Sequence, residues 1–531
     1  MAEGFDIDHL AKLARLSLTA EEKALYSSQL NQILGHFQAL ADADLPATID
    51  DARVVNEAAL RSDEPGPVLG AEAVTRIAPA SRDGQISVPR VVDDESYAMA
   101  DALHTLSAAE LGRRLAAGTL TSRALCEALI ARYQSVNDKV GAFTHLDQAD
   151  VLAQADASDA RRKAGQGRGP LEGIPVAIKD NIAVKGQPLT CSSKMLAPLV
   201  SPYDSHVAER LRAAGAILYG RLNMDEFAMG SSTENSAIRK TFNPWDLARI
   251  PGGSSGGSAA ALAAGLVPLS LGSDTGGSIR QPASHCGVVG LKPTYGLISR
   301  FGLVAFASSL DQIGPMARSI EDCELLLNAL SSADARDMTC FGPSDRGLTP
   351  AGDAKKLRIG IPKGFLGKGV APEVAAAVNA AVEFYRAQGC AISEVELPSA
   401  DLAVPTYYVV ATAEASSNLG RYDGVRYGHR SASAGTPVEM MTASRSEGFG
   451  PEVKRRILLG TFVLSAGYAD AYYVRALRAR AKIRSEYLAA LAGVDVLLTP
   501  TVPTPAFKVG EKASDPLQLY LEDIFTIPAN L

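Results

Sequence analysis

The residues of this sequence best suited to chemistry are a lysine and several serines beside apolar runs and glycine-rich turns. Lys179 ends the apolar run 174–178, where removal from bulk water makes a lysine ammonium easier to deprotonate. A neutral lysine can take the proton of a serine hydroxyl, directly or through a second hydroxyl, and so create a nucleophile. Lowering the pKa of a lysine from about 10.4 to about 7 costs about 4 kcal/mol, which burial and a cationic neighbour can supply. An isolated lysine here would be an ion-paired strand cap, so the assignment depends on its neighbours.

Glycine is concentrated in the middle of the chain, and the run 252–257 precedes a small-residue helix predicted at 258–264. A helix amino terminus can hold a phosphate, but this run has neither the lysine of a phosphate loop nor a strand before a G-x-G-x-x-G pattern. Residues 252–256 also fit G-x-S-x-G, yet an elbow between strand and helix is missing there. Two histidines lie downstream of Ser254: His285 and His429. Nucleotide binding and a histidine-based triad are therefore disfavoured alternatives.

Three blocks hold the candidate lysine and serines: Ile174–Asn181, Pro251–Ser258 and Gly272–Ala283. Lys179 and Ser254 are 75 residues apart, and Ser254 and Ser278 are 24 apart. In order and spacing these blocks resemble the amidase signature family, and the resemblance extends from about residue 100 to residue 531. It implies that Ser278 is the nucleophile, Ser254 a bridging serine on a cis peptide bond, and Lys179 the general base.

The residues around Ser278 suit that implied role. Glycines before it let neighbouring backbone amides converge on one point, as an oxyanion hole requires, and the amides concerned are those of Thr275, Gly276, Gly277 and Ser278. Polar residues at positions expected to be buried would orient the triad: Ser255, Asp274 and Arg280. Turn-stabilising hydrogen bonds are the alternative role for each of these three.

Within that family, further blocks resemble the A subunit of the glutamyl-tRNA(Gln)/aspartyl-tRNA(Asn) amidotransferases: 220–230, 406–408, 414–418 and 453–460. The resemblance implies glutamine as substrate. It assigns the α-carboxylate to Arg456, which can grip it with two parallel bonds, and the α-ammonium to Asp523, with Tyr407 closing the pocket. Arg455 is adjacent, so a slip of one residue would exchange the two arginines. Without the family, a surface arginine and a loop aspartate would be expected.

The amino-terminal part of the chain differs from the rest in pattern and charge. Residues 8–41 predict two helices, the second opened by a capping box of Thr19 and Glu22, and a proline-rich stretch without periodicity follows. Residues 1–95 hold 8 basic and 17 acidic residues, whereas residues 96–531 hold 44 and 42. This part resembles the C subunit of the same complex, a small protein that wraps around the A subunit. We therefore expect helices and an extended arm over 1–92, a linker at 93–104 and the amidase domain over 105–531.

The elements that must position the site alternate between helices and strands. Strands are predicted at 174–180, 216–222, 266–271, 288–291, 357–364 and, as a buried strand, 494–500; helices at 206–214 and 372–388, and a long helical stretch at 452–491. This is an α/β pattern. With the resemblance, it implies the amidase-signature fold, a mixed central β-sheet covered by helices, with an amino-terminal helical and extended wrapping segment.

Composition excludes several classes of protein. The 531 residues are 47% hydrophobic and 21% charged, with no apolar run long enough for a membrane span and no basic-then-apolar leader. Six scattered cysteines suggest neither a disulfide framework nor a zinc site. A cytoplasmic protein without a metal or cofactor of its own is expected.

The resemblance also implies partners. Ammonia from glutamine would pass to a separate amidotransferase B subunit, which binds misacylated tRNA and uses ATP with magnesium. The nearly neutral main domain agrees with tRNA contact lying mostly on that partner. Two alternatives stay open: a free-standing amidase acting on another amide, and a non-catalytic scaffold.

Two questions follow from the resemblance. Family members continue past the block 526–531 with further strands, so we expect this chain to be short at its carboxyl end and the pocket around Asp523 to be affected. Whether the product is Gln-tRNA, Asn-tRNA or both is not encoded in any motif that we identify.

Overall fold

The computed structural model describes residues 5–46, 81–82, 85–86, 103–342, 357–367, 369–433 and 435–531. Its centre is a six-stranded sheet in the order β3-β5-β4-β6-β8-β7. The strands are β3 Phe143–His145, β4 Pro175–Lys179, β5 Ile217–Leu222, β6 Leu269–Asp274, β7 Val289–Gly290 and β8 Gln312–Ala317. Strand β4 is parallel to β5 and β6, while β8 is antiparallel to β6 and β7, and β3 to β5. The predicted mixed sheet is confirmed.

The sheet places two of the sequence blocks at one edge. In β4 and β6, Ile178 pairs with Leu271, so the carboxyl ends of both strands lie side by side. Lys179 ends β4 and Asp274 ends β6. Every residue of both strands is buried, as expected for parallel strands covered on both faces. The edge therefore gathers buried polar residues.

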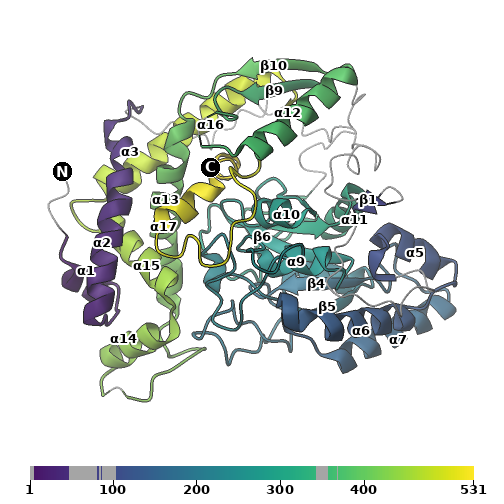
Figure 1. Cartoon of the computed structure of the whole chain (residues 1–531). Coiled ribbons are helices and arrows are strands. Elements are labelled where there is room, and N and C mark those ends of the chain that lie inside the picture. Colours follow the sequence, from purple (N-terminus) through teal and green to yellow (C-terminus); the bar gives the residue numbers. More distant parts are fainter. Residues whose placement is uncertain are drawn as a thin grey trace.

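Helices cover the faces of this sheet (Figure 1). They are α5 Ala108–Ala116, α6 Ser122–Val140, α7 Gln148–Lys163, α8 His206–Ala213, α9 Gly256–Ala263, α10 Arg280–Cys286 and α11 Ile320–Leu330. The small residues of α9 are all buried, and small side chains let this helix approach the sheet closely. Helix α9 begins two residues before the predicted start, so the glycine-rich turn leads directly into it.

A second sheet of three parallel strands has the order β10-β9-β11. Its strands are β9 Arg358–Pro362, β10 Ala391–Val395 and β11 Val496–Leu497, and α12 Pro372–Ala387 connects the first two. The prediction of a buried strand at 494–500 was wrong: only two residues pair, and Val496 is 40% exposed. The reason is its position at the sheet edge, where one side has no partner strand among the described residues.

The carboxyl-terminal half contributes a helical layer: α13 Ala403–Asn418, α14 Pro437–Gly448, α15 Pro451–Leu464, α16 Arg475–Gly493 and α17 Pro516–Tyr520. The long helical stretch predicted over 452–491 is interrupted. Helix α15 ends at Leu464 because the backbone of Ser465 is extended, and the Ser465 amide donates to the Phe462 carbonyl. A short π-helix, η9 Asp470–Val474, then leads into α16.

Short 3₁₀ turns complete this structure: η3 Leu103–Thr105, η4 Glu226–Ala228, η7 Ala400–Leu402, η8 Leu419–Arg421, η10 Leu521–Asp523 and η11 Ile527–Ala529. Turns η10 and η11 carry the last residues of the chain back toward the carboxyl edge of the central sheet, where Thr526 bonds Gly276. Among the described residues, none of the helices is both long and apolar enough to cross a membrane.

The amino-terminal residues form three helices, α1 Ile7–Leu13, α2 Ala20–His36 and the short α3 Gln38–Asp42. The predicted capping box is present, with the Glu22 amide donating to Thr19 Oγ1 at 3.2 Å and the Thr19 amide to Glu22 Oε2 at 3.0 Å. These helices lie along α13, α15 and α16 at one end of the molecule (Figure 1). The apolar stripe of α2 and α3 is buried there: Leu30, Ile33, Leu34, Phe37 and Leu40.

Most of the predicted arm and linker lies outside the described residues. From that part of the chain only the small hairpin of β1 Ser81–Arg82 and β2 Gln85–Ile86 is described. The division into an arm up to 92, a linker at 93–104 and a domain from 105 therefore stays a prediction.

Candidate active site

Lys179 lies at the centre of a buried cluster of hydroxyls. Its side chain is 0% exposed. The Nζ atom donates to Ser254 Oγ at 2.7 Å, Ser255 Oγ at 2.8 Å and Ser273 Oγ at 2.9 Å. The structure therefore brings together the ends of β4 and β6 and the turn before α9, as the family resemblance implies.

The surroundings of Lys179 favour its neutral form. Burial lowers its pKa to about 7, despite the opposing influence of buried Asp225, Asp274 and Asp311. A lysine half-neutral near pH 7 can act as a base, whereas an ordinary surface lysine cannot. Loss of water has the largest effect on this pKa, so the cationic neighbour that we considered from the sequence is not needed to lower it.

The hydroxyls around Nζ differ in which of them can give up a proton. Ser255 Oγ donates to the Ser273 carbonyl at 3.1 Å and accepts from the Ser273 amide, so its proton is committed. Ser273 Oγ also accepts from Asn181 Nδ2 at 2.9 Å. Within the described residues, Ser254 Oγ bonds to Lys179 and to no other side chain. A hydroxyl has one proton to donate, so Ser255 cannot pass its own to Lys179. Of the other two hydroxyls, Ser254 Oγ is closer to Nζ, and Ser254 precedes Ser255, whose amide donates to the Ser278 carbonyl.

The backbone at Ser254 is held on both sides. The Gly253–Ser254 peptide bond is cis. The Gly253 amide donates to Gln281 Oε1 at 2.8 Å, and the Ser254 carbonyl accepts from the Asp225 amide at 3.2 Å. These bonds fix the direction of the Ser254 side chain toward the lysine.

Ser278 lies just before α10 and is 8% exposed, unlike the fully buried Lys179 and Ser254. Its carbonyl accepts from the Ser255 amide at 3.1 Å, which ties the two serine-bearing turns together. A residual exposed surface is what a nucleophile needs to meet a substrate. The structure thus places Ser278 next to the same turn as Ser254.

Two glycines before Ser278 are required by close neighbours. A Cβ on Gly276 would lie 2.6 Å from the Tyr407 ring, and a Cβ on Gly277, whose φ is +147°, would lie 2.2 Å from Thr526 Oγ1. The Gly277 amide donates to Asp274 Oδ1 at 3.0 Å. In the described structure, the other amides of this turn have no acceptor: Thr275, Gly276 and Ser278. These three can point at a developing negative charge, whereas the Gly277 amide already has a partner.

Buried Asp274 and partly buried Arg280 form an ion pair beneath this turn. Arg280 donates to the Asp274 carboxylate through Nε at 3.0 Å and Nη2 at 2.9 Å. Burial alone would raise the pKa of Asp274, but the Arg280 guanidinium outweighs it and holds that pKa below the usual range. The ionised carboxylate also accepts from the amides of Gly277 and Ile279, so it shapes the turn that carries Ser278.

The two adjacent arginines of α15 point to different places, because consecutive residues of a helix are about 100° apart. Arg455 Nε donates to Gln29 of α2 at 2.8 Å. Arg456 is 2% exposed and lies among aromatic rings, with its guanidinium 5.1 Å from the Tyr520 ring and 5.3 Å from the Tyr408 ring. Tyr407 packs edge to face on Tyr408. Arg456 is therefore the arginine on the side of the candidate site.

Asp523 lies beside the turn that carries Ser278. Its Oδ1 would be 3.0 Å from a Cβ on Gly277, and its Oδ2 accepts from Ser231 Oγ at 2.6 Å. Oδ1 is buried and has no hydrogen-bond partner in the described structure. Burial raises the pKa of Asp523 to about 8. A buried carboxylate oxygen without a donor is a candidate partner for the cationic group of a ligand.

Sequence reasoning missed several residues of the site. Most stand inside or just after the blocks named above, and one lies further along the chain: Asn181, Asp225, Ser231, Ser273, Gln281 and Asp311. Asp311 accepts from Thr275 Oγ1 at 2.7 Å, and burial raises its pKa to about 6. The only available signal was a polar residue near a block, which does not distinguish a surface position from a buried one.

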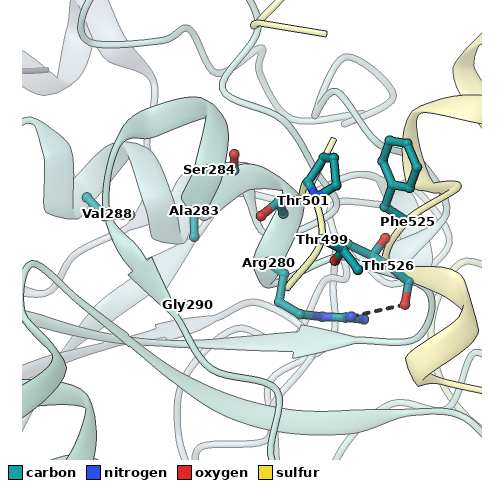
Figure 2. A pocket seen from close by; sticks show the side chains of 10 residues that line it. Arg280, Ala283, Ser284, Val288, Gly290, Thr499, Thr501, Phe525 and Thr526 are labelled. Atoms are coloured by element: carbon teal, nitrogen blue, oxygen red, sulfur yellow. Dashed lines mark hydrogen bonds between the residues drawn. The ribbon is translucent and has the colours of Figure 1, made fainter. Parts of the chain in front are cut away.

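A cavity of about 250 Å³ lies on the outer side of the Asp274–Arg280 pair. Figure 2 shows Arg280 reaching across to the Thr526 carbonyl, and Phe525 and Thr501 also line this cavity. None of the three triad candidates lines it. Since Arg280 also bonds Asn530 Oδ1, this region joins α10 to the carboxyl-terminal turns rather than forming the reaction centre.

Two family models match the chain. Residues 124–531 match the family described as Amidase, and residues 18–88 match the family described as Glu-tRNAGln amidotransferase C subunit. The two matches lie on either side of the boundary that we expected between an amino-terminal segment and a larger domain.

Curated relatives share the larger part. The A subunit of the glutamyl-tRNA(Gln) amidotransferase of Geobacter sulfurreducens is 52% identical over 431 residues, which are 81% of this chain and 89% of that protein. Its counterpart from Azoarcus sp. is 55% identical over 432 residues, 80% of this chain and 88% of that protein.

Solved structures share the fold. The A subunit of the Thermotoga maritima glutamyl-tRNA(Gln) amidotransferase has a TM-score of 0.65 at 40% identity, covering 81% of this chain and 86% of that one. Peptide amidase from Stenotrophomonas maltophilia has a TM-score of 0.64 at 30% identity, covering 78% and 86%. The predicted amidase-signature fold is confirmed.

Proposed function

This chain belongs to the amidase family and carries at its amino terminus a region of the amidotransferase C subunit family, and from this premise we propose that it hydrolyses glutamine to supply ammonia for tRNA-dependent amidation. The curated relatives named above are A subunits of the glutamyl-tRNA(Gln) amidotransferase. Here the regions that resemble the two subunits stand in one polypeptide. Covalent linkage keeps the segment near its docking surface at high effective concentration.

Glutamine needs one cation and one anion beside its amide. Arg456 is the proposed partner of the α-carboxylate, because a guanidinium can bind both carboxylate oxygens and its aromatic surroundings exclude water. Asp523 is the proposed partner of the α-ammonium, since its Oδ1 is buried without a donor in the described structure. Tyr407, which packs on Gly276, would close the pocket beside the reacting carbon.

The proposed reaction uses Lys179, Ser254 and Ser278. Neutral Lys179 takes the Ser254 proton while Ser254 takes the proton of Ser278, whose Oγ then bonds the side-chain amide carbon of glutamine. The amides of Thr275, Gly276 and Ser278 stabilise the oxyanion. The proton returns through Ser254 to the amide nitrogen, the carbon–nitrogen bond breaks, and ammonia leaves. Water then cleaves the glutamyl ester, which releases glutamate and restores Ser278.

Ammonia is the useful product in this proposal. It would pass to the separate B subunit, which binds the misacylated tRNA and activates its carboxylate with ATP and magnesium. Contacts of this chain with tRNA would be indirect. Whether Glu-tRNA(Gln), Asp-tRNA(Asn) or both are amidated follows from the tRNA that this partner accepts, and an assay with each misacylated tRNA decides it.

The observation that carries the proposal is the buried Lys179 with its Nζ 2.7 Å from Ser254 Oγ. The test is ammonia release from glutamine by the full chain in the presence of the B subunit, set against release by Ser278→Ala. We expect release by the unsubstituted chain and its loss in the variant, with unchanged circular dichroism. Release from other amides but not from glutamine would favour a free-standing amidase, and release from none would favour a scaffold.

A further inference from the structure

Glu452 of α15 is a buried carboxylate shared by two arginines. Its Oε1 accepts from Arg456 Nε at 2.7 Å and from the Tyr520 hydroxyl at 2.9 Å, while its Oε2 accepts from Arg455 Nη1. Exposed fractions are 5% for Glu452, 8% for Arg455 and 2% for Arg456. One carboxylate between two guanidiniums leaves a buried cluster with one positive charge in excess. A buried charge is stable only when it has a partner, so this cluster suits an anionic ligand.

Arg455 is held from its other side by the amino-terminal segment. Its Nε donates to Gln29 Oε1 at 2.8 Å, and its guanidinium lies 6.0 Å from the Tyr26 ring. Gln29 is itself buried, unlike most glutamines. The same helix α2 bonds α15 at Pro451, whose carbonyl accepts from Tyr26, and at Lys454, which pairs with Glu22 at 2.9 Å. The segment therefore fixes the face of α15 that is turned away from the site.

This arrangement determines which guanidinium nitrogens of Arg456 remain available to bind a substrate. A carboxylate and an arginine prefer two parallel hydrogen bonds when both carboxylate oxygens are available. Here Arg455 occupies Oε2, and of the Arg456 nitrogens in the described structure it is Nε that bonds Glu452. Without the hydrogen bond from Arg455, the Glu452 carboxylate could rotate and accept a hydrogen bond from a second nitrogen of Arg456. The edge proposed to bind the glutamine carboxylate would then be occupied.

We propose that Gln29 is a positioning residue for glutamine binding, acting through Arg455 and Glu452 on Arg456. Docking of the amino-terminal segment thus sets the affinity of the site for the substrate carboxylate. This inference rests on the proposed function, because that function assigns the carboxylate to Arg456.

The test measures ammonia release against glutamine concentration, with the full chain and the B subunit present. Gln29→Met removes the acceptor but keeps the side-chain length. Gln32→Leu is the control, because Gln32 is an exposed residue of the same helix whose side chain, among the described residues, bonds only Asp515. We expect Gln29→Met to raise KM about fivefold to tenfold, with kcat within about twofold. The effect on KM is smaller than for loss of a direct hydrogen bond between substrate and a charged group, because Gln29 acts through Arg455. Gln32→Leu should leave both constants unchanged.

A double-mutant cycle separates positioning from general destabilisation. Arg455→Met should raise KM, and adding Gln29→Met to it should have no further effect. Should Arg455→Met fail to fold, Arg455→Lys, which lacks the Nε donor, should show the same raised KM. 4-Aminobutanamide, which is glutamine without its carboxylate, serves as a competitor whose inhibition constant should not change in any variant.

Three results would overturn the inference: an unchanged KM in Gln29→Met, equal weakening of glutamine and 4-aminobutanamide, or additive effects in the cycle. Failure of the proposed function would look different, since the unsubstituted chain would then release no ammonia from glutamine.

Discussion

The Nζ of Lys179 lies 2.7 Å from Ser254 Oγ, although the two residues are 75 positions apart. Strand β4 carries the lysine into the sheet edge, and the turn before α9 carries the serine to the same point. Around them lie the buried hydroxyls of Ser255 and Ser273, and Lys179 itself is 0% exposed. The lysine is thereby kept out of water, which is the condition for its use as a base.

Replacing Lys179 by methionine should abolish catalysis and leave folding intact. Methionine fills a similar volume but cannot accept a proton, so we expect kcat for glutamine to fall by about 10²- to 10⁴-fold, the usual contribution of a general base. Lys185→Met, at an exposed position near by, is the matched control and should retain activity. Steady-state ammonia release measures both, and full activity in Lys179→Met would contradict the assignment.

The pH dependence of kcat should follow Lys179. Since burial lowers its pKa to about 7, the lysine is protonated and inactive below that value and neutral above it. We therefore expect kcat to rise with pH through about 7 and then level off. A kcat profile that is flat between about pH 6 and pH 8 would speak against a lysine base.

Asp523→Asn should weaken glutamine binding without removing the catalytic lysine and serines. Loss of a charged partner for the α-ammonium should raise KM about 10- to 100-fold, since a hydrogen bond to a charged group contributes about 1.5–3 kcal/mol. Glu511→Gln, an exposed change in the same segment, is the control. A KM equal to that of the unsubstituted chain would remove Asp523 from the substrate pocket.

The same carboxylate predicts a pH effect on KM. Burial raises the pKa of Asp523 to about 8, so below that pH the unliganded group carries a proton that must leave before it can pair with an ammonium. We expect KM for glutamine to fall as pH rises toward about 8. This trend should disappear in Asp523→Asn, and its persistence there would assign it to another group.

Two glycine-to-alanine changes should have opposite effects. Gly276→Ala would place a Cβ 2.6 Å from the Tyr407 ring, which must then move, so we expect loss of activity and of stability. Gly35→Ala in α2 meets nothing within 4 Å and should raise the free energy of unfolding by about 0.5–1 kcal/mol through helix propensity. Thermal melts measure the stability of both variants, and ammonia release measures the activity of Gly276→Ala. A stable and fully active Gly276→Ala would show that this contact is unimportant.

The candidate lysine and serines could be predicted from the sequence more readily than the residues that hold them in place. Lys179, Ser254 and Ser278 could be singled out because their three blocks, in order and spacing, resemble the amidase signature family. Ser273 could not, because a serine inside a buried strand looks like any small residue until its partner is known. Its bond to Lys179 depends on how β4 and β6 pair, which is a property of the fold.

The choice between Arg455 and Arg456 shows the same limit. Both are polar residues of one helix, and sequence periodicity cannot say which side of α15 faces the site. Only packing of α2 on one face and of Tyr408 and Tyr520 on the other separates them. Periodicity also failed at Ser465, because the backbone becomes extended there and ends α15 within an apparently continuous pattern.

The most direct measurement is to find where the glutamyl group is attached during turnover. The full chain, together with the B subunit, is mixed with glutamine, quenched in acid and digested, and its peptides are analysed by mass spectrometry. The account predicts a glutamyl ester on the peptide containing Ser278, lost on chase without glutamine and absent from Ser278→Ala. A glutamyl group on another residue, or undiminished ammonia release by Ser278→Ala, would contradict it.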